Sequence, residues 1–226
     1  MTMRSDVSIC ILSGPEPPTV HCYWGVTLQG DYPVYEIKNL APMSVAFNAM
    51  VSKATTPYIV QVDGDVALEP GAVDRLSSSL RALPPYYYMT WGQLYEEGFG
   101  RGGAVRCWKR WPLTLCKFRD VRCVDRDLHR RIRRFGMRRF QVPNPEPFGV
   151  HSPRTTPFAR YSKTKGDVQK WKFLGREDLL LEHLEAYAEA DHARAGCLIG
   201  LIQSPTKSKN LQRDWAEFEA LFTETP

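Results

Sequence analysis

The segment TPYIVQVDGDVALEPGAVDRL, residues 56–76, contains a short apolar run that ends on two aspartates, Asp63 and Asp65. The β-branched and aromatic residues of YIVQV predict a buried strand, and Pro70 and Gly71 predict a turn into a helix. Two carboxylates this close repel each other unless a proton or a cation lies between them. Hard divalent cations such as Mg²⁺ and Mn²⁺ prefer such oxygens and share them with phosphates. The pattern therefore indicates a metal site at the end of a strand, with a simple turn as the alternative.

The composition is that of an ordinary globular protein. Of the 226 residues, 43% are hydrophobic and 24% are charged, which suffices for a sizeable core. No run reaches the ~18 apolar residues that span a bilayer, and the first apolar run is too short for a secretory signal. The six cysteines form no C-x-x-C pair, which argues against a zinc site or a disulfide framework. We therefore expect a cytoplasmic protein with free thiols.

Apolar runs and helical spacings alternate along the first part of the chain. We predict strands over 7–12, 32–37 and 58–62, and helices over 19–28, 43–54 and 71–82. This alternation favours an α/β domain with a mainly parallel sheet, whose ligands bind beyond the carboxyl ends of the strands. Later patterns predict strands over 86–97, 104–111 and 138–143, a helix from Val124 to Gly136, a proline-rich loop over 144–157, and helices over 176–190 and 210–222.

Residues 41–80 resemble the donor half of nucleotide-sugar glycosyltransferases with the GT-A fold, most closely the inverting family-2 enzymes. In that family an asparagine-bearing helix, a strand, a D-x-D motif and a second helix follow one another. Asn48, Tyr58-Ile59, Asp63 to Asp65 and residues 68–76 fill those places here. The resemblance extends from residue 7 to about residue 155.

The resemblance implies a division of the chain into two domains. Residues 1–155 are expected to form a GT-A-like catalytic domain, a Rossmann-like and mainly parallel sheet flanked by helices. Its donor half would span about 7–82 and its acceptor half about 83–155. The resemblance leaves residues 156–226 unmatched. We expect them to form a C-terminal helical extension packed on the catalytic domain.

The resemblance also implies a second acidic motif, whose aspartate is the catalytic base at the start of a helix. CVDRDL, residues 123–128, fits that place, with Asp125 at the base position and Asp127 as the second acid, although Val124 replaces the usual glutamate. Helix capping and pairing with neighbouring arginines is the alternative reading. Many members have a later histidine that completes the metal site, and His151 of FGVHSP matches it. The implied metal ligands are Asp63, Asp65 and His151.

Donor contacts are expected by position in the resembling family. The residues concerned are Ser13, Gly14, Pro15, Glu36, Asn48, Asp63, Gly102 and Gly103. The glycines of GFGRGG, residues 98–103, match G-x-G-x-x-G, but a strand pattern follows where a dinucleotide-binding motif requires a helix. We therefore expect this segment to be either a flexible loop beside the donor sugar or a plain hairpin.

Arginine is concentrated in one stretch of the chain. Nine arginines and three aspartates between Arg119 and Arg139 give this stretch a charge of +6, while the whole chain carries +5. Such a run is most often a solvated helix face. With Trp108, Trp111 and Phe118 nearby, it can also bind a phosphate backbone and stack bases.

Together these features predict a metal-dependent, inverting glycosyltransferase that moves a hexose or pentose from a nucleotide sugar to an acceptor hydroxyl. The expected cofactors are Mn²⁺ or Mg²⁺ and a nucleotide-sugar donor, with UDP as the expected nucleotide. The candidate acceptors are a hydroxylated base of phage or viral-type DNA, a glycan, and a small molecule. A catalytically silent GT-A-like module that binds nucleic acid is the alternative from a different class.

Overall fold

The computed structural model describes residues 6–96, 100–151, 157–175, 196, 200 and 210–222. Residue contacts divide the chain into two compact units. The first unit comprises Met1–Leu40, Val45–Phe118 and Asp125–Ser152, and the second comprises Ala41–Ser44, Arg119–Val124 and Pro153–Pro226. All the site residues predicted from the sequence belong to the first unit.

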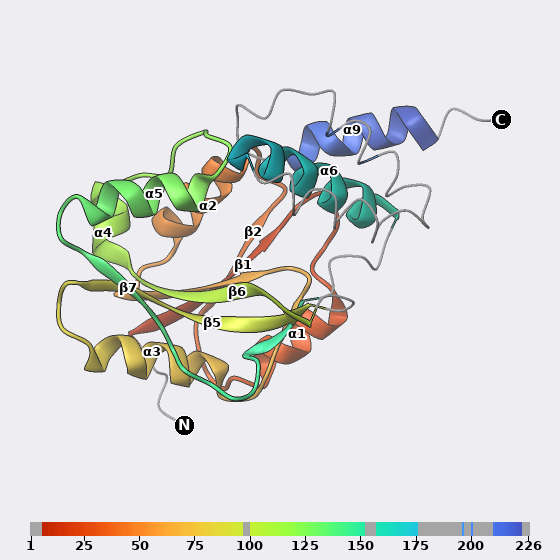
Figure 1. The fold of residues 1–226 in the computed structure, drawn as a ribbon. Coiled ribbons are helices and arrows are strands. Elements are labelled where there is room, and N and C mark those ends of the chain that lie inside the picture. The colour runs from red at the N-terminus through yellow and green to blue at the C-terminus, as the bar shows by residue number, and fades with distance from the viewer. Residues whose placement is uncertain are drawn as a thin grey trace. The chain divides into compact units, whose positions relative to one another are not determined.

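One mixed sheet forms the centre of the first unit (Figure 1). Its strands are β1 (Val7–Ser13), β2 (Val34–Lys38), β3 (Tyr58–Asp63), β4 (Val66–Leu68), β5 (Tyr87–Glu96), β6 (Gly100–Lys109), β7 (Arg138–Gln141) and β8 (Gly149–His151). They follow the order β2-β1-β3-β6-β5-β8-β4, and β7 pairs with β5 outside this path. The β1–β2, β1–β3, β5–β7 and β5–β8 pairings are parallel, and β3–β6, β5–β6 and β4–β8 are antiparallel.

Helices cover both faces of this sheet. Figure 1 shows α1 (Val20–Thr27) and α3 (Ala72–Ala82) on one face, and α2 (Met43–Lys53), α4 (Arg110–Leu115) and α5 (Val124–Arg133) on the other. Alternate residues of β1 and β3 point to the first face, where they join apolar side chains of α1 and α3 in one core. This core includes Ile9, Ile11, Val60, Val62, Cys22, Val26, Leu76 and Leu80.

The predicted strand, helix, strand, helix, strand order of the first 63 residues is confirmed, as is the helix predicted over 71–82. Further along the chain the structure corrects three expectations. Gly100 to Gly103 belong to β6, which forms a hairpin with β5, so for these residues the hairpin alternative is confirmed and the flexible loop is wrong. The segment predicted as a proline-rich loop contains β8, and the residues after the D-x-D motif contain the unpredicted β4. These two three-residue strands are too short to show a period, and they form because they pair with each other.

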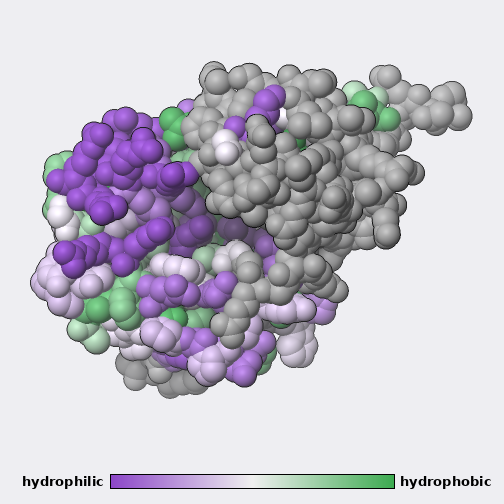
Figure 2. Space-filling view, in the orientation of Figure 1, coloured by the Kyte–Doolittle hydropathy of each residue, from purple (hydrophilic) through white to green (hydrophobic). Residues whose placement is uncertain are grey.

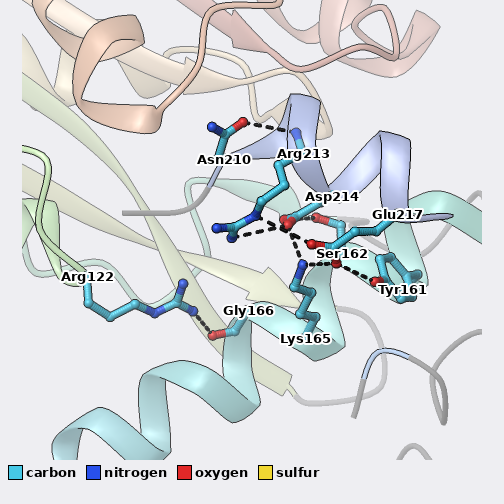
Figure 3. A network of polar contacts seen from close by, with 9 residues as sticks. All are labelled: Arg122, Tyr161, Ser162, Lys165, Gly166, Asn210, Arg213, Asp214 and Glu217. Carbon is cyan, nitrogen blue, oxygen red and sulfur yellow. Dashed lines mark hydrogen bonds and ion pairs between the residues drawn. The ribbon is translucent and has the colours of Figure 1, made fainter. Parts of the chain in front are cut away.

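The second unit contains the helices α6 (Pro157–Leu174) and α9 (Leu211–Phe222). A polar cluster joins them, centred on Lys165, which is only 1% exposed (Figure 3). The Lys165 ammonium donates to Asp214 over 2.7 Å and also to Glu217, and the Tyr161 hydroxyl donates to Glu217 over 3.0 Å. The helix predicted over 210–222 is confirmed, and α6 was not predicted. The helix predicted over 176–190, like Cys197, lies outside the described residues.

None of the described helices has both the length and the apolar character needed to cross a bilayer.

Candidate active site

The D-x-D motif is a tight turn between β3 and β4. Asp63 ends β3, and the backbone N–H of Gly64 donates to the Leu12 carbonyl over 2.8 Å. The Gly64 carbonyl in turn accepts from Thr19 N–H over 2.8 Å. A Cβ at position 64 would lie only 3.2 Å from Ser13 Cβ and 3.3 Å from the Leu12 oxygen. The close approach of these backbones explains why glycine separates the two aspartates.

His151 lies directly beside Asp65. The end of β8 pairs with the start of β4, which places His151 opposite Val66. The His151 Nε2 atom is 3.4 Å from Asp65 Oδ2. Its Nδ1 atom is 3.7 Å from Oε2 of Glu96, the last residue of β5. Thus three chain segments bring an aspartate, a histidine and a glutamate to one edge of the sheet.

The Asp63 carboxyl group is surrounded by several charged side chains. Asp63 is exposed to solvent at the end of β3. Partial desolvation of the carboxyl group, and then the charge of Asp65, raise the pKa of Asp63 above its usual value. The positive charges of Arg106 and His151 act in the opposite direction. A divalent cation at this turn would remove the repulsion between the two carboxylates.

Asp125 lies on the first turn of α5 and pairs with an arginine of the sheet. The Arg106 Nη2 atom is 2.9 Å from Asp125 Oδ2. The Asp125 Oδ1 atom is buried and accepts no hydrogen bond from any described residue. Asp127, two residues later, points elsewhere and pairs with Arg131 over 2.8 Å. Arg131 also donates to the Lys117 carbonyl over 2.8 Å, so Asp127 helps to fix the local backbone.

A layer of aromatic and amide side chains lies between the D-x-D strand and α5. Because Gln61 pairs with Arg106 across β3 and β6, alternate residues Asp63, Gln61, Arg106 and Trp108 face the same side of the sheet. Gln61 donates to Asp63 Oδ1 over 3.5 Å and accepts from Trp108 Nε1 over 3.2 Å. The Trp108 ring stacks on His129 of α5, with centroids 5.8 Å apart. This layer ties the position of Asp125 to that of Asp63.

The structure also locates the residues expected to contact the donor. Ser13 ends β1 beside Asp63, since Leu12 is the register partner of Asp63, and Gly14 and Pro15 follow it. A Cβ on Gly103 would lie 3.5 Å from His151 Nδ1, and Gly102 precedes it on β6. These residues and the D-x-D turn therefore gather at one edge of the sheet.

Two other expected donor contacts have partners within the protein. Glu36 lies on β2 and forms an ion pair with Lys38. The Asn48 side chain donates to the Phe118 carbonyl over 2.9 Å and accepts from Phe118 N–H over 3.0 Å. Asn48 thereby joins α2 to the segment that leads toward α5. The prediction that Asn48 and Glu36 contact the donor stays a prediction.

The donor set at the D-x-D turn fits a cation that is bound together with a substrate. Within the part of the chain that the structure describes, no group of three or more His, Cys, Asp or Glu side chains could by itself hold a metal ion. The Asp65 and His151 donor atoms are nevertheless close enough to bind one ion together. Ions such as Mg²⁺ take one or two carboxylates from the protein and complete their shell with phosphate oxygens and water. The residues present match that mode of binding.

Sequence reasoning missed two side chains of this region, Arg106 and Glu96. Arg106 belongs to the strand predicted over 104–111, which the structure places at Gly100–Lys109 with α4 beginning at Arg110. Nothing in its local pattern sets Arg106 apart from the other arginines. Glu96 is 8% exposed and ends a predicted strand, which is the same signal that identified Asp63. Its position at the end of a strand could have identified it as a candidate.

Comparisons with known proteins support the fold. The chain is similar to the mannosyltransferase PcManGT from Pyrobaculum calidifontis, solved in complex with GDP-Man and Mn²⁺. This similarity covers 100% of this chain and 82% of the mannosyltransferase chain, with a TM-score of 0.55 and 15% sequence identity. Glucosyl-3-phosphoglycerate synthase from Mycobacterium tuberculosis gives a TM-score of 0.49 and 11% identity, covering 83% of this chain and 82% of its own. A cytidylyltransferase from Thermus thermophilus has a TM-score of 0.43 and 13% sequence identity, and the similarity covers 66% of this chain and 94% of the cytidylyltransferase chain. No protein-family model and no curated protein matches the chain.

The fold comparison rests on the mannosyltransferase, which has a TM-score above 0.5. Its TM-score and coverage agree with an α/β, GT-A-like fold for this chain, with a mixed sheet flanked by helices and a C-terminal helix. The chain thus has an α/β fold similar to that of this mannosyltransferase.

Proposed function

We propose that the protein is a metal-dependent, inverting glycosyltransferase of the family-2 type that uses a nucleotide-sugar donor. The observation that carries this proposal is the pairing of Asp65 with His151 at 3.4 Å, beside Asp63, on a GT-A-like sheet. Chain segments 86 residues apart supply these side chains, as the resemblance implies for the metal site. The similar mannosyltransferase was solved with GDP-Man and Mn²⁺, which supports the same class of donor and metal here.

The donor end of the site would act through charge. Asp65 and His151, with Asp63, would hold Mn²⁺ or Mg²⁺, and the bound cation would offset the negative charge that grows on the departing diphosphate. Ser13, Gly14 and Pro15 at the end of β1 would contact the nucleotide, with UDP as the expected nucleotide and Glu36 and Asn48 as further contacts. Gly102 and Gly103 would leave room for the sugar beside His151, because a side chain at position 103 would approach the His151 ring.

The acceptor end would act through Asp125. Its carboxylate would take the proton of the acceptor hydroxyl as that oxygen attacks the anomeric carbon from the side opposite the leaving group. One such displacement inverts the configuration at the anomeric carbon. The ion pair with Arg106 would hold the Asp125 carboxylate in place between the donor and the acceptor. Asp127 would support this motif through its ion pair with Arg131.

The donor half is proposed to span about residues 7–82 and the acceptor half about 83–155, with 156–226 as a helical extension. This division places Asp63 and Asp65 in the donor half, and Asp125 and His151 in the acceptor half. The metal site would therefore join the two halves.

A donor-hydrolysis assay tests the proposal. The protein is incubated with UDP- or GDP-linked sugars and Mn²⁺, and release of the nucleoside diphosphate is quantified without an acceptor. We expect slow release that EDTA and Asp65→Ala both abolish, while Glu146→Gln, at an exposed position outside this site, leaves it unchanged. Release that neither EDTA nor Asp65→Ala affects would contradict the metal assignment. No release with any donor would favour the alternative of a silent binding module.

For the acceptor, the exposed arginines of α5 favour a polyanion over a neutral glycan. A hydroxylated base of phage or viral-type DNA offers both a hydroxyl group and flanking phosphates. Such a base within a duplex must be flipped out before it can reach Asp125. Transfer from the preferred donor to hydroxymethylated DNA, detected by mass spectrometry of the nucleosides, tests this acceptor against glycan and small-molecule acceptors.

A further inference from the structure

Six arginines form one exposed surface at α5 and the residues that follow it. We call this the arginine surface, and it consists of Arg126, Arg130, Arg133, Arg134, Arg138 and Arg139. Arg126, Arg130 and Arg133 are spaced at i, i+4 and i+7 and therefore lie along one face of α5. Figure 2 shows a strongly hydrophilic area where Figure 1 places α5.

The charge of this surface is not balanced within the described part of the chain. Arg131 and Arg122, from the same run of sequence, have partners: Arg131 pairs with Asp127, and Arg122 donates to the Gly166 carbonyl. None of the six arginines of the surface forms an ion pair with a described carboxylate. Six uncompensated guanidinium groups repel one another, and an anionic partner would remove this repulsion. The structure thus separates the arginines that stabilise the fold from those that remain available to a ligand.

The chemistry of the surface matches a chain of phosphates. Guanidinium groups bind phosphate through two parallel hydrogen bonds, and several of them in a row fit an anion that repeats along a backbone. Aromatic side chains adjoin the arginines in sequence or in space. Phe135 is 78% exposed, and Tyr86 is 46% exposed and lies under the Arg138 guanidinium at 5.7 Å. Exposed aromatic rings of this kind stack on unpaired bases.

The outward face of α5 is less suited to a lipid surface. An interfacial helix inserts its apolar face between lipids and keeps its basic face toward the head groups. In α5 the apolar residues Val124, Leu128 and Ile132 are at most 3% exposed, so they are already buried in the protein. Only the basic face is presented outward. Binding through charge to a flexible polyanion therefore fits this helix better than insertion does.

The arginine surface begins next to the proposed catalytic base. Asp125 and Arg126 are neighbours on the first turn of α5, and Arg130 and Arg133 extend away from Asp125 along the helix. Arg134, Arg138 and Arg139 follow the end of the helix. We infer that the arginine surface binds the phosphate backbone of single-stranded nucleic acid and delivers its hydroxyl-bearing nucleotide to Asp125. This inference rests on the proposed function for the delivery step. The binding step stands independently of it.

Fluorescence anisotropy with a labelled 20-nucleotide oligothymidylate tests the binding step. The measurement uses the full chain in EDTA without a donor, over a series of salt concentrations. Arg130→Gln/Arg134→Gln removes two charges from the surface. Lys53→Gln/Arg81→Gln removes two exposed charges from α2 and α3 and serves as the matched control. Circular dichroism checks that each variant is folded, and vesicles containing phosphatidylserine provide the competing anionic surface.

We expect salt-dependent binding that the surface variant weakens at least tenfold at low salt and the control changes less than twofold. The slope of log affinity against log salt should fall by about 1.4, since each phosphate contact to a single strand contributes about 0.7. Phe135→Ser should weaken single-strand binding about tenfold and duplex binding much less, because it removes a stacking ring. Each of these results supports the inference.

Three results would overturn it: equal weakening by the control variant, binding to vesicles but not to the oligonucleotide, or no binding to either. Failure of the proposed function has a different signature. If the protein binds the oligonucleotide but does not hydrolyse any donor, the binding inference holds and the proposed transferase function is wrong. If the protein hydrolyses a donor but does not bind the oligonucleotide, the transferase function holds and the binding inference is wrong.

Discussion

Arg106 of β6 and Asp125 of α5 form an ion pair of 2.9 Å, and the same arginine acts on Asp63 through its charge. This one side chain therefore lies between the proposed metal site and the proposed base. A cation at Asp63 and Asp65 must be bound against the positive charge of Arg106, while Asp125 depends on that charge for its position.

Arg106→Gln should consequently affect the transfer rate and the Mn²⁺ affinity differently. We expect the transfer rate to fall by about tenfold or more, because the Asp125 carboxylate loses the partner that fixes it. Mn²⁺ affinity should be unchanged or higher, because a positive charge near the carboxylates is removed. Calorimetric titration with Mn²⁺ and a transfer assay measure the two quantities. Arg106→Lys, which keeps the charge, should retain the wild-type Mn²⁺ affinity; loss of Mn²⁺ binding in Arg106→Gln would contradict this account.

Asp125 and Asp127 should differ in their roles. We expect Asp125→Asn to reduce transfer by about 10²- to 10⁴-fold, the usual effect of losing a general base, with donor binding retained. Asp127→Asn should reduce transfer far less and lower the free energy of unfolding by about 0.5 kcal/mol, since it removes a partly exposed i,i+4 pair with Arg131. Transfer kinetics and urea denaturation of both variants provide the comparison. A reversed order of the two rates would assign the base to Asp127.

Glu96 is expected to act through His151, whose Nδ1 atom lies 3.7 Å from Glu96 Oε2. A carboxylate on the second ring nitrogen orients a ligating histidine, and its loss lowers metal affinity by about 10- to 100-fold. We expect Glu96→Gln to weaken Mn²⁺ binding within this range, and His151→Ala to weaken it at least as much. Mn²⁺ titration followed by electron paramagnetic resonance measures both. Unchanged affinity in Glu96→Gln together with reduced affinity in His151→Ala would remove Glu96 from the site.

The parts of the site that could be predicted are those with a local signal. Asp63 and Asp65 follow a buried strand, and Asp125 opens a helix whose apolar spacing is regular, so each appears in a short window of sequence. Their places in a family motif, and that of His151, added the expectation of a shared site. The structure brings Asp65 and His151 together as expected.

The positions of Arg106 and Glu96 in the site depend on pairing between strands that are far apart in the sequence, so no short stretch of sequence reveals them. Arg106 reaches the face of Asp63 only because β6 runs antiparallel to β3 in a register that sets it opposite Gln61. Glu96 meets His151 because β8 lies between β5 and β4, and β8 has only three residues. A shift of one residue in either register would turn these side chains to the opposite face.

The buried cluster of the second unit should respond strongly to the loss of its cation. In Lys165→Met, Asp214, whose side chain is 3% exposed, would lose the ammonium at 2.7 Å and keep only the longer contact with Arg213 at 3.7 Å. Removing one partner of a buried ion pair costs about 3–5 kcal/mol, and because Arg213 remains near Asp214 we expect a loss toward the lower end of this range in the free energy of unfolding. Chemical denaturation followed by tryptophan fluorescence, with Trp215 on α9 as a reporter, measures it. Lys170→Met, at an exposed position of the same helix, is the control, and an equal loss there would contradict the prediction.

His129 should make stability fall with acid below neutral pH. Burial lowers the pKa of His129 from 6.5 to about 4, and the nearby charge of Asp125 offsets only part of this effect. Between these two values the unfolded chain binds a proton that the folded chain does not, so stability decreases as the pH falls from 6.5 toward 4. The difference corresponds to up to about 3 kcal/mol in the free energy of unfolding. Urea denaturation of the wild type and His129→Gln at several pH values tests this: the slope between pH 4 and 6.5 should be smaller in the variant. Equal slopes would contradict the prediction, because they would show that His129 binds its proton over the same pH range in the folded and the unfolded chain.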